Sequence, residues 1–143
     1  MTSGTELENK LKYLDSFIGV FPCDQIPLYD RLPVSMIINT DKHNQKGEHW
    51  VAIYISKKKG YYFDSYGMPP LNKEIEDYMN NYTNVWKYNQ RTIQGLNSYK
   101  CGQFCVLFII LKSFGYSFNQ ITHLFTTDFK INDFIVQKLY DLF

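Results

Sequence analysis

The sequence predicts an α+β domain built around one buried helix. Periodic segments follow one another as helix, strands, helix, strand and three helices, without the regular strand–helix alternation of a parallel α/β protein. Residues 50–55 and 61–64 are apolar, strand-forming segments joined by a Ser-Lys-Lys-Lys-Gly turn, a pattern typical of a hairpin. Residues 101–111 are apolar on nearly all sides and too long for a typical strand, which favours a central helix.

The remaining elements follow from the spacing of apolar residues, prolines and capping residues. Helical periodicity covers residues 6–14 and 71–81, and short strand-like runs cover residues 34–38 and 85–88. Residues 21–33 carry three prolines and are expected to be mostly loop. Ser117 is a suitable N-cap for a helix through residue 125, and Asn132 or Asp133 for a last helix to residue 142.

The composition fits one domain spanning residues 1–143. The chain is 45% hydrophobic and 17% aromatic, enough for a sizeable core at this length. Its net charge of +1 provides no global basic field for nucleic acid. The longest apolar run, residues 104–111, is too short to span a bilayer, and the first ten residues lack a secretory signal pattern. We therefore expect an intracellular domain that is neither secreted nor attached to a membrane.

Cys101 is the candidate nucleophile among three cysteines, an odd number that forms no disulfide framework. A thiol in the first turn of a buried helix meets the helix dipole and free N–H groups, which favour the thiolate. Gly102, directly after it, is expected to let a substrate backbone approach. The alternative, a buried structural cysteine, fits Cys105 well, and Cys23 has no evident role. The spacing of the cysteines and histidines indicates no metal site.

His49 is the candidate base because it stands immediately before the apolar strand, whereas His43 lies in a polar loop and His123 in an ordinary amphipathic helix. Asp64 ends the returning strand of the hairpin. A hairpin places the start of its first strand beside the end of its second, so His49 and Asp64 are expected in lateral register. The carboxylate would then orient the imidazole. The alternatives are a loop histidine without a role and an aspartate that forms a turn.

Gln94 is the candidate oxyanion donor. It lies seven residues before Cys101, in a loop that must lead into the central helix. Its side-chain amide and the Cys101 N–H could together bind a developing negative charge. On its own, Gln94 would be interpreted as a solvated loop residue. Elsewhere in the chain, the three lysines at 57–59 are interpreted as a solvated turn rather than a nucleic-acid patch.

Three motifs together resemble the adenovirus protease (adenain) family, which includes proteases of Polinton/Maverick-type elements. They are Gly-Glu-His-Trp at 47–50, Phe-Asp-Ser-Tyr-Gly at 63–67 and Gln-Gly-Leu-Asn-Ser-Tyr-Lys-Cys-Gly-Gln-Phe-Cys at 94–105. The resemblance covers roughly residues 10–115. It implies a papain-like, adenain-like mixed sheet packed on a central helix that starts at the catalytic cysteine.

The resemblance also implies a cysteine endopeptidase and a role for each candidate residue. Cys101 would attack the scissile carbonyl while His49 transfers the proton. Asp64 would orient the imidazole, and Gln94 with the Cys101 N–H would bind the oxyanion. The implied substrates are viral or transposon capsid and core precursors, cleaved at glycine-containing sites. The implied locations are the virion and the nucleus or cytoplasm of the host, and we expect a monomer.

Adenoviral enzymes use a disulfide-linked peptide and DNA as activators, and the resemblance would extend both to this chain. No cysteine lies between residues 64 and 94, however, and the net charge is only +1. We therefore expect neither a covalent peptide nor DNA to be required.

Two other functions stay open. The Asp-Ser pair at 64–65 is also similar to the ubiquitin-like-protein (SUMO) proteases, which share the fold and the catalytic order. A non-catalytic capsid or scaffold module is the third hypothesis. The presence of all four candidate residues favours an enzyme, because a binding module needs none of them.

Overall fold

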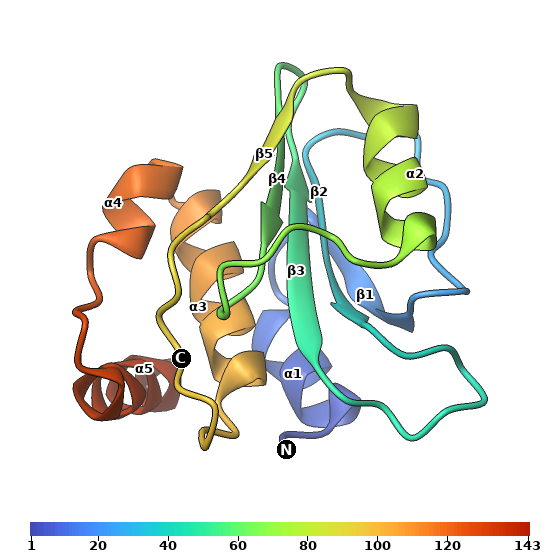
Figure 1. Cartoon of the computed structure of the whole chain (residues 1–143). Helices are drawn as coiled ribbons and strands as arrows, with labels where there is room; N and C mark the ends of the chain where they lie inside the picture. The colour runs from blue at the N-terminus through green and yellow to red at the C-terminus, as the bar shows by residue number, and fades with distance from the viewer.

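Five strands form one mixed sheet in the computed structural model, which describes all 143 residues (Figure 1). The strands lie in chain order: β1 (Phe17–Pro22), β2 (Val34–Asn39), β3 (Trp50–Ile55), β4 (Gly60–Phe63) and β5 (Trp86–Tyr88). The three inner strands pair antiparallel, and each edge strand pairs parallel to its neighbour. The hairpin expected from the sequence is β3–β4.

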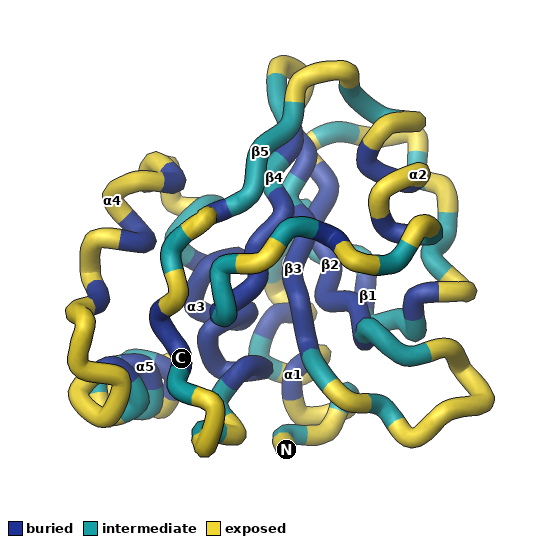
Figure 2. Tube along the Cα trace, viewed as in Figure 1, coloured by how far each residue is buried: buried dark blue, intermediate teal, exposed yellow.

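The helices divide between the two faces of the sheet. Four of them, α1 (Gly4–Leu11), α3 (Cys101–Ser113), α4 (Phe118–Thr122) and α5 (Phe129–Leu142), share one hydrophobic core with one sheet face. The opposite face is covered by α2 (Lys73–Tyr82), as Figure 1 shows. Residues 101–110 of α3 are all buried, and Figure 2 shows this helix enclosed while α4 and α5 expose their outer sides. None of the helices is both long and apolar enough to traverse a bilayer.

The α+β class and the mixed sheet on a central helix that begins at Cys101 are confirmed. The expected loop over 21–33 is wrong at its start, because β1 extends to Pro22. An edge strand tolerates this proline, since one side of its backbone has no strand partner. The helix expected from Ser117 has the predicted N-cap but is shorter, ending at Thr122.

The N-cap expected for the last helix is also wrong. Helix α5 begins at Phe129, and Asp128 caps it by accepting from the N–H groups of Lys130 and Ile131. Asn132 lies instead inside the helix, fully buried, where its amide donates to the carbonyls of Ile93 and Thr126. This buried amide ties α5 to the segment that precedes Gln94.

Candidate active site

Cys101 occupies the first position of α3 and is only 4% exposed. The preceding residue, Lys100, makes no side-chain capping bond, and no hydrogen bond engages the N–H groups of residues 101–103. These free donors and the positive end of the helix dipole surround the thiol. The site therefore has the electrostatics that stabilise negative charge on sulfur or on a nearby oxyanion.

The imidazole of His49 bonds to the carboxylate of Asp64, with 2.7 Å between Nε2 and Oδ1. Phe63 pairs with Ala52, so His49 and Asp64 meet diagonally across the end of the hairpin rather than directly opposite each other. The His49 side chain is only 15% exposed, and burial on its own would lower its pKa. The hydrogen bond to Asp64 and the nearby Cys101 thiol outweigh burial and, with the charge of both partners, raise the pKa of His49 from 6.5 to about 9. The imidazole thus lies between the acid and the thiol.

Two residues that sequence reasoning missed hold this acid and base in place. The N–H of Tyr66 donates to Asp64 Oδ1 at 2.9 Å, the same oxygen that His49 contacts. The Tyr66 ring stacks on the imidazole, with centroids 4.7 Å apart and planes 23° from parallel. Asn89, after β5, bonds to the Asp64 backbone in both directions: its Oδ1 accepts at 3.0 Å and its Nδ2 donates at 2.7 Å. Tyr66 belongs to a motif already singled out, but no local pattern marks Asn89.

Gln94 is held by Ser65, the residue after the acid. Both side chains are buried, with Gln94 only 1% exposed. The backbone oxygen of Ser65 accepts from the N–H groups of Ile93 and Gln94 at 2.9 and 3.1 Å. The Ser65 hydroxyl donates to Gln94 Oε1, and Gln94 Nε2 donates to the Ser98 carbonyl at 3.1 Å. These contacts assign Oε1 and Nε2 of the Gln94 amide, and they leave one N–H of Nε2 without a partner.

Gly102 has a packing role that was not expected from the sequence. A Cβ at this position would lie 3.0 Å from Leu7 Cδ2 and 3.2 Å from Trp50 Cδ1. The glycine therefore lets α1 and the Trp50 indole pack against the start of α3. Packing therefore favours a glycine after Cys101, and the approach of a substrate backbone at this position stays a prediction.

The other thiols and histidines lie in different surroundings. Cys105 is fully buried, and burial raises its pKa well above the ordinary value, which suits the packing role expected for it. Cys23 is also buried, and burial raises its pKa as well. All three cysteines are free. His43 pairs with Asp24 at the surface, and the exposed His123 bonds to a carbonyl of its own helix.

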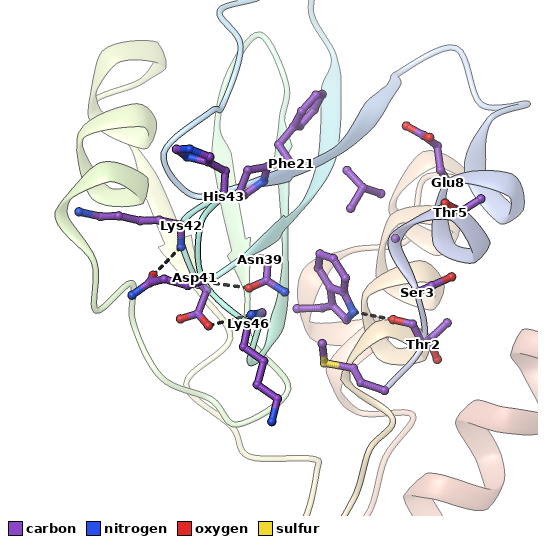
Figure 3. Close-up of a pocket in the computed structure, with 17 residues that line it drawn as sticks. Thr2, Ser3, Thr5, Glu8, Phe21, Asn39, Asp41, Lys42, His43 and Lys46 are labelled. Carbon is purple, nitrogen blue, oxygen red and sulfur yellow. Dashed lines mark hydrogen bonds between the residues drawn. The ribbon is translucent and has the colours of Figure 1, made fainter.

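A groove of about 560 Å³ opens beside Trp50, between the N-terminal residues and the loop over 39–47. Figure 3 shows Ser3 and Glu8 on one side of this groove and Asp41 and Lys46 on the other. The Trp50 indole donates to the Thr2 carbonyl at 3.0 Å and lines the groove. Since Trp50 follows His49 and contacts α3 near Cys101, the groove borders the candidate site.

The structure brings His49, Asp64 and Cys101 together and binds the Gln94 loop to the residue after the acid. Their catalytic roles stay predictions. No group of three His, Cys, Asp or Glu side chains has the arrangement of a metal site. The site thus combines a thiol, a base bonded to an acid and a set of unpaired N–H donors at the start of α3. These are the groups that acyl transfer to a thiol requires.

Comparison with known proteins gives two informative matches, although no family model matches the chain. The chain is 34% identical over 131 residues to a protein of Acanthamoeba polyphaga mimivirus that is named "Putative thiol protease R355". The match covers 73% of this chain and 43% of that protein. The fold is similar to that of the ASFV pS273R protease, with a TM-score of 0.53 and 20% identity, over 71% of this chain and 43% of that one. The chain thus spans less than half the length of either relative. The expected resemblance to viral cysteine proteases is confirmed in sequence and in fold.

Proposed function

We propose, on the premise that this chain resembles viral thiol proteases in sequence and in fold, that it is a cysteine endopeptidase with Cys101 as its nucleophile. The observation that carries the proposal is the position of His49, which bonds to the Asp64 carboxylate and lies close enough to the Cys101 thiol for that thiol to raise the His49 pKa. A cysteine at a helix start, a base within reach and an acid behind the base are the parts that thiol-dependent acyl transfer requires.

The mechanism follows from these positions. The Cys101 thiolate attacks the scissile carbonyl, and the oxyanion accepts hydrogen bonds from the Cys101 N–H and the free N–H of Gln94 Nε2. The His49 imidazolium protonates the leaving amine, so that the C–N bond breaks and a thioester remains. His49 then takes a proton from water, whose oxygen attacks the thioester and releases the acid product and the Cys101 thiolate, so that the thiolate and imidazolium are restored. Asp64 keeps the imidazole in one orientation throughout.

The substrates we propose are viral or transposon capsid or core precursor proteins cleaved beside glycine. The support for a viral protein substrate is the similarity to a mimivirus protein. The support for glycine is steric: the sulfur belongs to a residue that is only 4% exposed, so a slim backbone segment reaches it more easily than a bulky side chain.

Cleavage profiling on a peptide library tests this function, with wild type, Cys101→Ala and His49→Ala compared with and without added DNA. We expect wild type to cleave glycine-containing sites, both variants to be inactive, and DNA to change nothing. Ubiquitin-like C-terminal aldehydes form a further arm. If Cys101 reacts with these aldehydes while wild type ignores the peptides, the proposed substrate class is wrong. No turnover of any substrate would instead favour a scaffold module.

A further inference from the structure

One face of α5 lies along residues 94–101, the segment that joins the candidate oxyanion donor to the nucleophile. Three α5 residues at steps of four share this face and contact the segment: Phe129, Asp133 and Gln137. Phe129 packs against Gly95, where an added Cβ would lie 3.2 Å from the Phe129 Cβ. Gln137 Oε1 accepts from Lys100 Nζ at 2.7 Å. Helix α5 therefore holds both ends of the segment, and Asp133 contacts its middle.

The middle of the segment is organised by Ser98. Its N–H donates to the Gly95 carbonyl at 3.0 Å, and its own carbonyl accepts from Gln94 Nε2 at 3.1 Å. Its hydroxyl oxygen accepts from the N–H of Lys100, the residue before the nucleophile, at 3.2 Å. Ser98 therefore joins the Gln94 amide to the start of α3 by two of its own atoms.

Asp133 sets the direction of the Ser98 hydroxyl. A hydroxyl has a single proton, and Ser98 donates it to Asp133 Oδ1 at 2.9 Å, which leaves its lone pairs for the Lys100 N–H. Asp133 is half-buried, makes no ion pair and has no other side-chain hydrogen bond. Because a bond to an ionised acceptor is about twice as strong as a neutral one, this contact dominates the position of the hydroxyl.

We propose that Asp133 is a positioning residue for the oxyanion site. Acting through Ser98, it holds the Gln94 amide and the N–H groups at the start of α3 at the spacing that receives the oxyanion. Its removal should therefore weaken binding of the transition state while the substrate still binds and the thiol stays reactive. The inference rests on the proposed protease function, because it assigns a positioning role within that reaction.

The test is steady-state cleavage of a glycine-containing peptide by Asp133→Ala. Loss of a whole oxyanion donor costs about 10²–10³ in kcat, so a displaced donor should cost about tenfold, with KM unchanged. Asp133→Asn keeps an acceptor oxygen and should restore most of the rate. A peptide aldehyde forms an oxyanion on Cys101 and should bind about tenfold more weakly to Asp133→Ala. Alkylation of Cys101 by iodoacetamide forms no oxyanion, so its rate should not change.

A double-variant comparison tests whether Asp133 acts through Ser98. Ser98→Ala should lower kcat by a similar factor, and adding Asp133→Ala to it should lower kcat no further. Asp77→Ala is the matched control, because it removes an exposed aspartate from α2, and it should leave kcat unchanged.

Three results would each overturn this inference while the protease function stands. They are an unchanged kcat in Asp133→Ala, losses that multiply in the double variant, and Cys101 alkylation that slows together with kcat. Absence of cleavage by wild type, whatever the peptide, would instead overturn the function itself and this inference with it.

Discussion

Asp64→Asn is the substitution whose effect can be worked out most fully from the structure. It removes the negative charge beside His49 while keeping the size of the side chain and one acceptor oxygen. With Asp64 present, the pKa of His49 is raised from 6.5 to about 9 against the opposing effect of burial. Without the Asp64 charge, less opposes the effect of burial, which disfavours the charged imidazolium. We therefore expect the pKa of His49 to fall.

The magnitude follows from linkage between protonation and folding. At about 1.4 kcal/mol per pKa unit, the difference between 6.5 and about 9 corresponds to roughly 3 kcal/mol of stability. His49 is mostly buried, so solvent screening reduces this only modestly. Because the folded-state pKa is the higher one, the stabilisation is fully present below pH 6.5 and is lost as the pH rises through 9. The stability difference between wild type and Asp64→Asn should therefore shrink by up to about 3 kcal/mol across that window.

Urea denaturation followed by circular dichroism at pH values from 6 to 10 measures this difference. An NMR titration of the His49 ring should show its pKa directly, with a lower value in Asp64→Asn. The matched control is Asp77→Asn, which makes the same change at the exposed pair with Lys73 and should not alter the pH dependence. A stability difference between wild type and Asp64→Asn that stays constant from pH 6 to 10 would refute the claim that Asp64 supports the imidazolium.

Three further substitutions test how the site is held. Ser65→Ala frees the amide of Gln94, so kcat should fall about 10- to 100-fold with little change in KM, while the rate of Cys101 alkylation stays the same. An unchanged kcat in steady-state assays would contradict this role. Gly67→Ala should lower the free energy of unfolding by about 3 kcal/mol, because φ is +75° and the added Cβ would lie 2.7 Å from the Arg91 carbonyl carbon. Asn132→Ala should lower it by about 2–4 kcal/mol by leaving buried backbone groups unpaired, and denaturant titration would show both losses.

The elements that could be predicted from the sequence are those with a strong local pattern. The hairpin, α2 and α3 each have an uninterrupted apolar periodicity, and their positions are nearly those expected. Strand β1 was missed because it is irregular at Gly19 and ends at a proline, both of which weaken a local signal. The N-cap of α5 was misplaced because Asp128 competes with other suitable caps nearby, and only burial shows that Asn132 is a core residue.

The candidate site shows the same division between local and long-range information. His49, Asp64 and Cys101 were found because each stands at the end of an element whose position the sequence determines, and Gln94 because it lies in the loop that leads to Cys101. The contacts that hold them were not foreseeable, because Ser65–Gln94 and Asn89–Asp64 join residues 29 and 25 positions apart. The contact of Asp133 with Ser98 is equally invisible in the sequence, where an aspartate near the start of a helix predicts an ordinary cap.

The central claim, that Cys101 is a nucleophile activated by His49, is tested most directly by covalent trapping. A glycine-containing peptide vinyl sulfone is incubated with the protein near neutral pH, and the adduct is located by intact and peptide mass spectrometry. We predict one adduct per chain, on Cys101 alone, lost in His49→Ala and absent from the buried Cys23 and Cys105. An adduct that forms equally fast in His49→Ala, or no adduct on Cys101 in the wild type, would contradict the account.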